Sequence, residues 1–160
     1  MNIILNIEDI NCNNFFVNDE IKNTIIDQGT FHKLNYSNEV FTLTNSMIEL
    51  KITEYDIYKN YHRYKIVFSP EKYISIVEKI SSIEKNIINI LKIKLDRKKR
   101  PVLNIGPILS SGYFKISHIP GIMERIALKI SGIWETDIEY GLTYKFVIIY
   151  NNTNRLLKNK

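Results

Sequence analysis

The 160-residue sequence predicts a mainly β fold of the α+β class, an OB-fold-like antiparallel barrel with one long amphipathic helix over about residues 70–95. Hydrophobic and polar residues alternate over most of the chain, which is the pattern of strands with one buried face. Between residues 70 and 95 the hydrophobic spacing changes to three and four residues, which is typical of a helix. Hydrophobic residues make up 44% of the chain, enough at this length to bury the core of a single domain.

The first part of the chain combines an ambiguous region with three strand patterns. Residues 2–7 suit a short strand, whereas residues 19–28 have helical spacing and a glycine after the last turn. Alternating residues then predict strands at 40–43, 47–55 and 61–68. Ile48, Leu50 and Ile52 are expected on the buried face of the second of these strands.

The helix is expected to begin at Ser69-Pro70-Glu71, which supplies a capping serine, a proline at the first helical position and an acid in the first turn. Its hydrophobic residues continue to Leu91, and the helix ends in the basic run Arg97-Lys98-Lys99-Arg100 before Pro101. Cations at that end complement the helix dipole, so the run has a structural explanation as well as a binding one.

Four strand patterns follow the helix. They cover residues 102–109, which Gly106-Pro107 interrupts, 112–118, 124–134 and 142–150. The last pattern is nearly all apolar and is therefore expected at the centre of a sheet. We expect one domain over residues 1–160, made of an acidic N-terminal extension over 1–37, a barrel core over 38–150 and a basic tail over 151–160.

Charge is unevenly distributed along the chain, whose formal net charge is +5. Residues 1–58 carry a net charge of −6, and residues 59–160 carry +11. This basic second part predicts a polyanionic partner. The alternative is a solvated surface that reflects biased codons, because 30 Ile, 18 Asn and 17 Lys against one Ala indicate an AT-rich genome. Codon bias explains the run at 97–100 least well, since arginine is otherwise scarce.

Composition excludes several classes of protein. Cys12 is the only cysteine, so an internal disulfide and cysteine-based zinc sites are excluded. The sequence has no apolar run of the roughly 18 residues that a membrane span needs, and its start lacks the basic leader of a secretory signal. We therefore expect an intracellular protein that makes no membrane contact.

Catalytic and cofactor motifs are scarce. The three histidines are far apart, and the sequence has no nucleotide-binding glycine loop. We therefore expect no enzyme activity, no metal and no cofactor. One enzyme-like pattern stays open as an alternative. Glu49 and Lys51 match the E-x-K spacing of metal-dependent nucleases, which need a second acid upstream, and Asp27 is the nearest.

Aromatic and cationic residues are interleaved on the predicted strands, as in Tyr-His-Arg-Tyr-Lys at residues 61–65. This combination binds single-stranded nucleic acid, because bases stack on aromatic rings while Lys and Arg contact phosphates. The predicted stacking residues are Tyr61, Tyr113, Trp134 and Tyr144. The predicted phosphate contacts are Arg63, Lys65, Arg97, Lys98, Lys99, Arg100, Lys115, Lys129 and Lys145. The alternative is that these aromatic residues pack the core, since Tyr and Phe favour strands.

Trp134 is open to both interpretations. Strict alternation along its strand places it beside Leu128 and Ile130, and so in the core. The turn after Glu135 could instead leave the ring at the rim of a barrel, where it would meet DNA.

The segments K-I-S-G-I-W-E at residues 129–135 and Y-G-L-T-Y-K-F at residues 140–146 resemble the C-terminal hairpin of OB-fold single-stranded DNA-binding proteins of large DNA viruses, of the insect-infecting or nucleocytoplasmic type. The amphipathic helix and the basic R-K-K-R-P segment agree with this resemblance, which covers about residues 60–150. It implies a barrel with a helix between its third and fourth strands. It also implies sequence-independent binding of single strands in DNA replication, recombination and repair, without catalysis.

The same resemblance implies a place in the host nucleus or in a viral replication compartment. Such binders often recruit replication proteins through an acidic tail, whereas this sequence ends in basic residues. The acidic N-terminal part is therefore the candidate for that role. Two alternatives stay open: RNA in place of DNA, and a structural or protein-interaction module of a virion or transcription complex.

Overall fold

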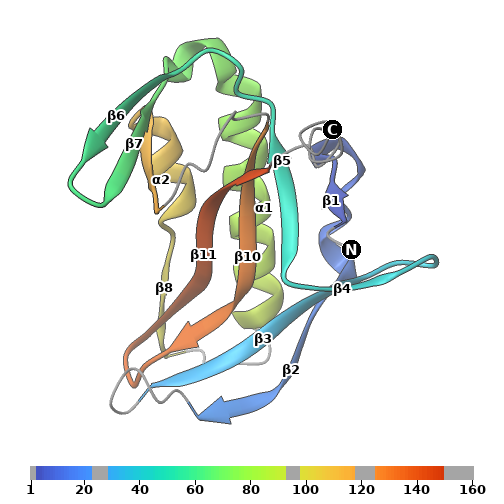
Figure 1. Ribbon diagram of the computed structural model, residues 1–160. Coiled ribbons are helices and arrows are strands. Elements are labelled where there is room, and N and C mark those ends of the chain that lie inside the picture. The colour runs from blue at the N-terminus through green and yellow to red at the C-terminus, as the bar shows by residue number, and fades with distance from the viewer. Residues whose placement is uncertain (1–2, 23–28, 93–97, 118–124, 150–160) are drawn as a thin grey trace, which may run out of the picture.

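The chain forms two β-sheets and a long helix in the computed structural model (Figure 1), which describes residues 3–22, 29–92, 98–117 and 125–149. Within these ranges strands predominate, and the larger sheet curls into a half-barrel. The predicted mainly β, α+β class, with a barrel-like sheet and one long helix, is therefore confirmed.

The larger sheet has eight strands. They are β1 (Ile4–Leu5), β2 (Phe15–Lys22), β3 (Thr30–Ser37), β4 (Thr42–Thr44), β5 (Ser46–Leu50), β8 (Arg100–Val102), β10 (Arg125–Glu135) and β11 (Glu139–Ile149). Five of them follow the order β1-β5-β10-β11-β8, and β3 pairs with the second half of β10 as well as with β2 and β4. The first 37 residues, predicted as an acidic extension, thus supply three strands of this sheet.

The smaller sheet has three antiparallel strands in the order β6 (Asp56–Asn60), β7 (Arg63–Val67) and β9 (Tyr113–Ile116). Tyr61 and His62 form the turn of the β6–β7 hairpin, which projects from the body of the molecule in Figure 1. Phe114 of β9 stacks on Phe146 of β11 with ring centroids 4.3 Å apart, so the two sheets share one core.

A short 3-10 helix (Pro70–Tyr73) leads into α1 (Ile74–Lys92), the predicted long helix. α1 lies behind β10 and β11 in Figure 1 and buries its stripe of isoleucines against them. Proline starts the helical segment as predicted, but the Ser69 hydroxyl donates a hydrogen bond to Glu71 Oε2, 2.7 Å away, and makes no capping bond. Residues 93–95 of the prediction lie outside the described residues.

The helix predicted at residues 19–28 is wrong where the structure describes it. Residues 19–22 belong to β2, and residues 23–28 lie outside the described residues. The local spacing favoured a helix, but pairing with β3 decides the conformation, since Ile21 lies opposite Phe31 in the hairpin. Tertiary pairing of this kind leaves no signal within a short window of sequence.

The second half of the strand predicted at 102–109 is a helix, α2 (Ile105–Ser110). Gly106 and Pro107, the predicted interruption, lie in its first turn. Glycine permits close packing on α1 here, because a Cβ at Gly106 would lie 2.6 Å from Ser81 Oγ. Two more 3-10 helices precede β2 at Ile7–Asp9 and Cys12–Asn14.

The strand patterns at 40–43, 47–55, 61–68, 112–118, 124–134 and 142–150 overlap β4, β5, β7, β9, β10 and β11. The second prediction is wrong for residues 51–55, because β5 ends at Leu50, and residues 118, 124 and 150 lie outside the described residues. Ile48, Leu50 and Ile52 are buried as predicted. Strand β6 had no prediction of its own. In the described part of the chain seven strands, rather than three, precede α1, because β1, β2 and β3 join the larger sheet and β6 pairs with β7 in the smaller one.

β10 contains a bulge, with one extra residue between Ile130 and Gly132 relative to β11. The bulge reverses the alternation, because residues directly opposite each other on paired strands share a face. Trp134 therefore lies with Lys129 on the outer face of the sheet, turned away from the core. Its predicted place beside Leu128 and Ile130 is wrong.

Candidate nucleic-acid interface

The smaller sheet has one buried face and one outer face. On the buried face, Ile66 and Phe114 lie opposite each other and are 0% and 2% exposed. The next residues along each strand point the other way, so Lys65 and Lys115, which are also directly opposite each other, lie on the outer face. Two of the predicted phosphate contacts thus come together by strand pairing.

A shallow groove of about 250 Å³ surrounds the turn of the β6–β7 hairpin. We call it the hairpin groove, and it is lined by Asn60, Tyr61, His62, Arg63, Tyr64, Lys65 and Lys115. Tyr61 is 89% exposed, and it adopts a positive φ of 53° in the turn. Four predicted binding residues, Tyr61, Arg63, Lys65 and Lys115, therefore line this groove.

A second groove, of about 430 Å³, lies between β9, β11 and α2. We call it the β9–β11 groove, and it is lined by Ile108, Ser111, Tyr113, Phe114, Lys115, Tyr144, Lys145 and Phe146. The buried residues Phe114 and Phe146 contribute to its lining. Lys115 lines both grooves, which makes them one continuous surface, called the groove surface below.

The groove surface joins aromatic rings to cations. Lys65 Nζ lies 4.1 Å from the centroid of the Tyr113 ring, a cation–π contact between β7 and β9. Burial, and then the charge of Glu84, raise the pKa of the Tyr144 hydroxyl, so this ring stays neutral at physiological pH. Among the described residues that line the two grooves there is no acidic side chain. The surface therefore suits an anion with planar groups.

Two further predicted residues lie on the outer face of the larger sheet. Lys129 is directly opposite Lys145, so it extends the cations of the groove surface onto β10. Trp134 is half-buried farther along the same strand. Its indole packs on Gly141 so closely that a Cβ there would lie 2.8 Å from Cζ2. Trp134 is thus separate from the two grooves.

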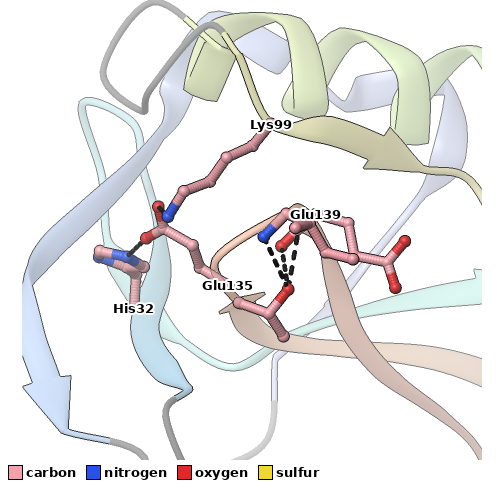
Figure 2. A network of polar contacts seen from close by, with 6 residues as sticks. His32, Lys99, Glu135 and Glu139 are labelled. Atoms are coloured by element: carbon pink, nitrogen blue, oxygen red, sulfur yellow. Dashed lines mark hydrogen bonds and ion pairs between the residues drawn. The ribbon is translucent and has the colours of Figure 1, made fainter.

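The predicted basic cluster lies near the opposite end of β11 from Lys145. Lys99 and Arg100 bind acids there. Lys99 Nζ lies 2.6 Å from Glu135 Oε1 (Figure 2), and Arg100 Nη2 lies 2.6 Å from Glu139 Oε2. Lys98 is exposed beside them, and Arg97 lies outside the described residues. The two ion pairs give Lys99 and Arg100 a structural role in joining β8 to the β10–β11 hairpin.

Glu135 is the centre of a buried polar cluster at the end of β10, shown in Figure 2. Its side chain also accepts a hydrogen bond from His32 Nε2, 2.8 Å away on β3. Burial raises the pKa of Glu135, but the hydrogen bonds and charges of Lys99 and His32 outweigh that effect, so its pKa lies below the ordinary value. The cluster fastens β3 and the start of β8 to β10.

This cluster makes acid stability depend on Lys99. Because the folded pKa of Glu135 is depressed, its carboxylate stabilises the fold above the ordinary glutamate pKa of about 4.3 and loses that contribution as the pH falls through the folded value. Replacing Lys99 with methionine is expected to cost about 1–2 kcal/mol at neutral pH and to move the acid-unfolding midpoint upward. Circular dichroism against pH measures both changes.

The matched control for that prediction is Arg100→Met, which removes an exposed ion pair from the adjacent residue. The Arg100 side chain is 76% exposed, whereas that of Lys99 is 18% exposed. An exposed pair contributes about 0–1 kcal/mol, so the control is expected to leave the acid midpoint nearly unchanged. Equal midpoints for the two variants would contradict the assignment.

Sequence reasoning missed Tyr58, which lies on β6 directly opposite Lys65 and is 54% exposed. It shares the outer face of the small sheet with Lys65 and Lys115. A signal was present: residues 58–65 are rich in aromatic and basic residues, and the observed turn at Tyr61 and His62 lies near their middle. Read as a hairpin, that stretch predicts two strands in place of one.

The two residues of the nuclease pattern, Glu49 and Lys51, lie in different surroundings in the structure. Glu49 lies on the outer face of β5, half-buried, with its Oε2 3.9 Å from Arg125 Nη1. Lys51 is exposed beyond the end of the strand, and Asp27 lies outside the described residues. Nowhere in the described ranges do three or more His, Cys, Asp or Glu side chains gather in a way that could hold a metal ion.

The fold and the groove surface define a mainly β, α+β protein with a basic, aromatic-lined surface on a projecting hairpin. No family model, no curated protein and no solved structure matches the chain.

The helices that the structure describes are all too short or too polar to span a bilayer.

Proposed function

We propose that this protein binds single-stranded nucleic acid, DNA in the first instance, along the groove surface and without cleaving it. The observation that carries the proposal is the convergence of seven predicted binding residues on two grooves that share Lys115. They are Tyr61, Arg63, Lys65, Tyr113, Lys115, Tyr144 and Lys145. These residues come from the three strands β7, β9 and β11 and one turn, so no short stretch of sequence accounts for their meeting.

The chemistry of the groove surface favours unpaired strands over duplex. Exposed rings such as Tyr61 and Tyr113 offer faces on which bases can stack, at about 1–3 kcal/mol per base. A duplex keeps its base faces stacked inside, so it can use only the cations. Because every base has a π-face, stacking of this kind tolerates any sequence.

The resemblance of residues 128–146 to viral single-strand binders supports a role in DNA replication, recombination and repair, in the host nucleus or a viral replication compartment. The acidic residues of the N-terminal part are the proposed contact for replication proteins. Among the described residues of this part, Glu8 and Asp9 lie in the 3-10 helix Ile7–Asp9 and Asp19 and Glu20 lie on β2, so this contact would involve a folded surface.

Titration of labelled oligo-dT against duplex DNA and single-stranded RNA at two salt concentrations tests the proposal. Oligo-dT is expected to bind well ahead of duplex, and its log affinity is expected to fall linearly with log salt, with a slope near −0.7 per phosphate contact. Duplex binding that is equal or tighter would overturn the proposal. Salt-insensitive or absent binding would favour the protein-interaction module instead.

A further inference from the structure

The outer face of the small sheet carries two exposed tyrosines with a lysine between them. Tyr58 on β6 is 54% exposed, and Tyr113 on β9 is 41% exposed. Lys65 on the middle strand β7 lies directly opposite Tyr58 and directly opposite Lys115, which shares its face with Tyr113 two residues away. Strand pairing therefore fixes all four side chains on one face.

The two rings are placed to hold different bases. They stand on the outer strands of a three-stranded sheet, two strand spacings apart, which is about 10 Å across the sheet. Lys65 occupies the space between them and leans over Tyr113, with Nζ 4.1 Å from the ring centroid. Each ring thus has its own approach from solvent, and a cation stands next to both.

The position of Lys65 implies an exchange when a base binds to Tyr113. A base that stacks on the covered face of this ring must take the place of the ammonium group. An exposed cation–π contact is weaker than the stacking of a base on an aromatic ring, so the exchange is favourable. The released ammonium group then lies beside the backbone of the same nucleotide and can contact its phosphate.

We infer that Tyr58 and Tyr113 form a two-base stacking platform on the β6–β7–β9 sheet, with Lys65 moving from the Tyr113 ring to a phosphate as the strand binds. The inference rests on the proposed function and deepens it, because it names a stacking residue outside both grooves and gives Lys65 two positions. The ligand it requires is an unpaired polynucleotide.

Binding of oligo-dT to Tyr58→Leu tests the platform. The change keeps an apolar strand residue but removes the ring, and it is expected to weaken binding about 5- to 150-fold. Tyr58→Phe keeps the ring and is expected to stay within about twofold of the unmodified protein. The matched control is Phe16→Leu, which removes a 37% exposed ring from β2, a strand of the larger sheet that lies apart from the β6–β7–β9 sheet in Figure 1, and is expected to leave binding unchanged.

An abasic oligonucleotide of the same length separates stacking from charge. It carries the same phosphates without bases, so Tyr58→Leu and the unmodified protein are expected to bind it equally. This comparison also guards against a folding defect, because a misfolded variant would lose affinity for both probes.

Lys65→Gln tests the exchange itself. If Lys65 moves to a phosphate, the variant is expected to flatten the salt slope by about 0.7 on oligo-dT. A slope that does not change would show that Lys65 stays on the ring, and would overturn the exchange.

Different results would overturn the proposed function and the two-base stacking platform. If the unmodified protein binds no oligo-dT, the proposed function falls and the platform falls with it. If the unmodified protein binds but Tyr58→Leu binds equally well, the platform alone is overturned. The same holds if Tyr58→Leu loses as much affinity for the abasic probe as for oligo-dT.

Discussion

Replacing Glu84 with glutamine lowers the free energy of unfolding by about 3–4 kcal/mol. Glu84 lies on α1 with 2% of its surface exposed, and its carboxylate accepts three backbone N–H bonds at the start of α2. The N–H groups of Asn104, Ile105 and Gly106 donate at 2.8, 3.0 and 2.9 Å. These groups have no partner within their own helix, so the carboxylate satisfies them.

Glutamine has nearly the same shape but presents an NH₂ donor in place of one acceptor oxygen. That NH₂ group faces a backbone N–H group that also donates. Neither group then has an acceptor inside the protein. Urea unfolding followed by circular dichroism measures the loss, with an unchanged m value showing that the native state keeps its compactness.

Glu78→Gln is the matched control, because Glu78 lies on the same helix but is exposed. An exposed change of this kind is expected to stay within about 0.5 kcal/mol of the unmodified protein. If the two glutamine variants unfold at the same urea concentration, Glu84 does not stabilise the junction of the two helices.

Exchanging Arg63, Lys115 and Lys145 for glutamine weakens oligo-dT binding by on the order of 100-fold at 0.1 M salt. The three side chains are exposed and line the groove surface. Each lost phosphate contact removes about 0.7 from the slope of log affinity against log salt, so three contacts remove about 2. The deficit is expected to shrink as the salt concentration approaches 1 M.

The control for charge alone is the triple variant of Lys51, Lys85 and Lys92, which removes the same net charge from exposed positions outside the two grooves. Fluorescence anisotropy over a range of salt concentrations measures the slope for both triple variants. If the control loses as much slope as the groove variant, net charge determines the affinity and the groove surface does not.

Elements with a strong local period were predictable from the sequence. The long helix from Pro70 follows from a hydrophobic repeat of three and four residues that continues over about five turns. A strand has a period of two residues, so this repeat does not fit a strand. The strand predicted at 112–118 is observed as β9, and its alternation of apolar and polar residues agrees with the burial of Phe114 and Ile116 and the exposure of Tyr113. In both cases the residues that decide the conformation are neighbours in sequence.

Elements decided by distant residues were not predictable. The bulge in β10 depends on pairing with β11, and without it the face of Trp134 is assigned wrongly. Glu84 gave no signal because its partners are backbone N–H groups about 20 residues away. The ion pairs of Lys99 and Arg100 likewise join residues that are more than 30 positions apart.

The outer face of the small sheet affects how copies of the protein associate. β6 is an edge strand, and Tyr58 and Tyr61 expose apolar rings beside it, a combination that promotes association between proteins. Arg63, Lys65 and Lys115 on the same hairpin and sheet oppose that association, because two copies brought face to face repel each other. A polyanion lying on this face would neutralise the repulsion while leaving the strand edge open. Molecules bound side by side on one long strand would then attract each other more than free molecules do.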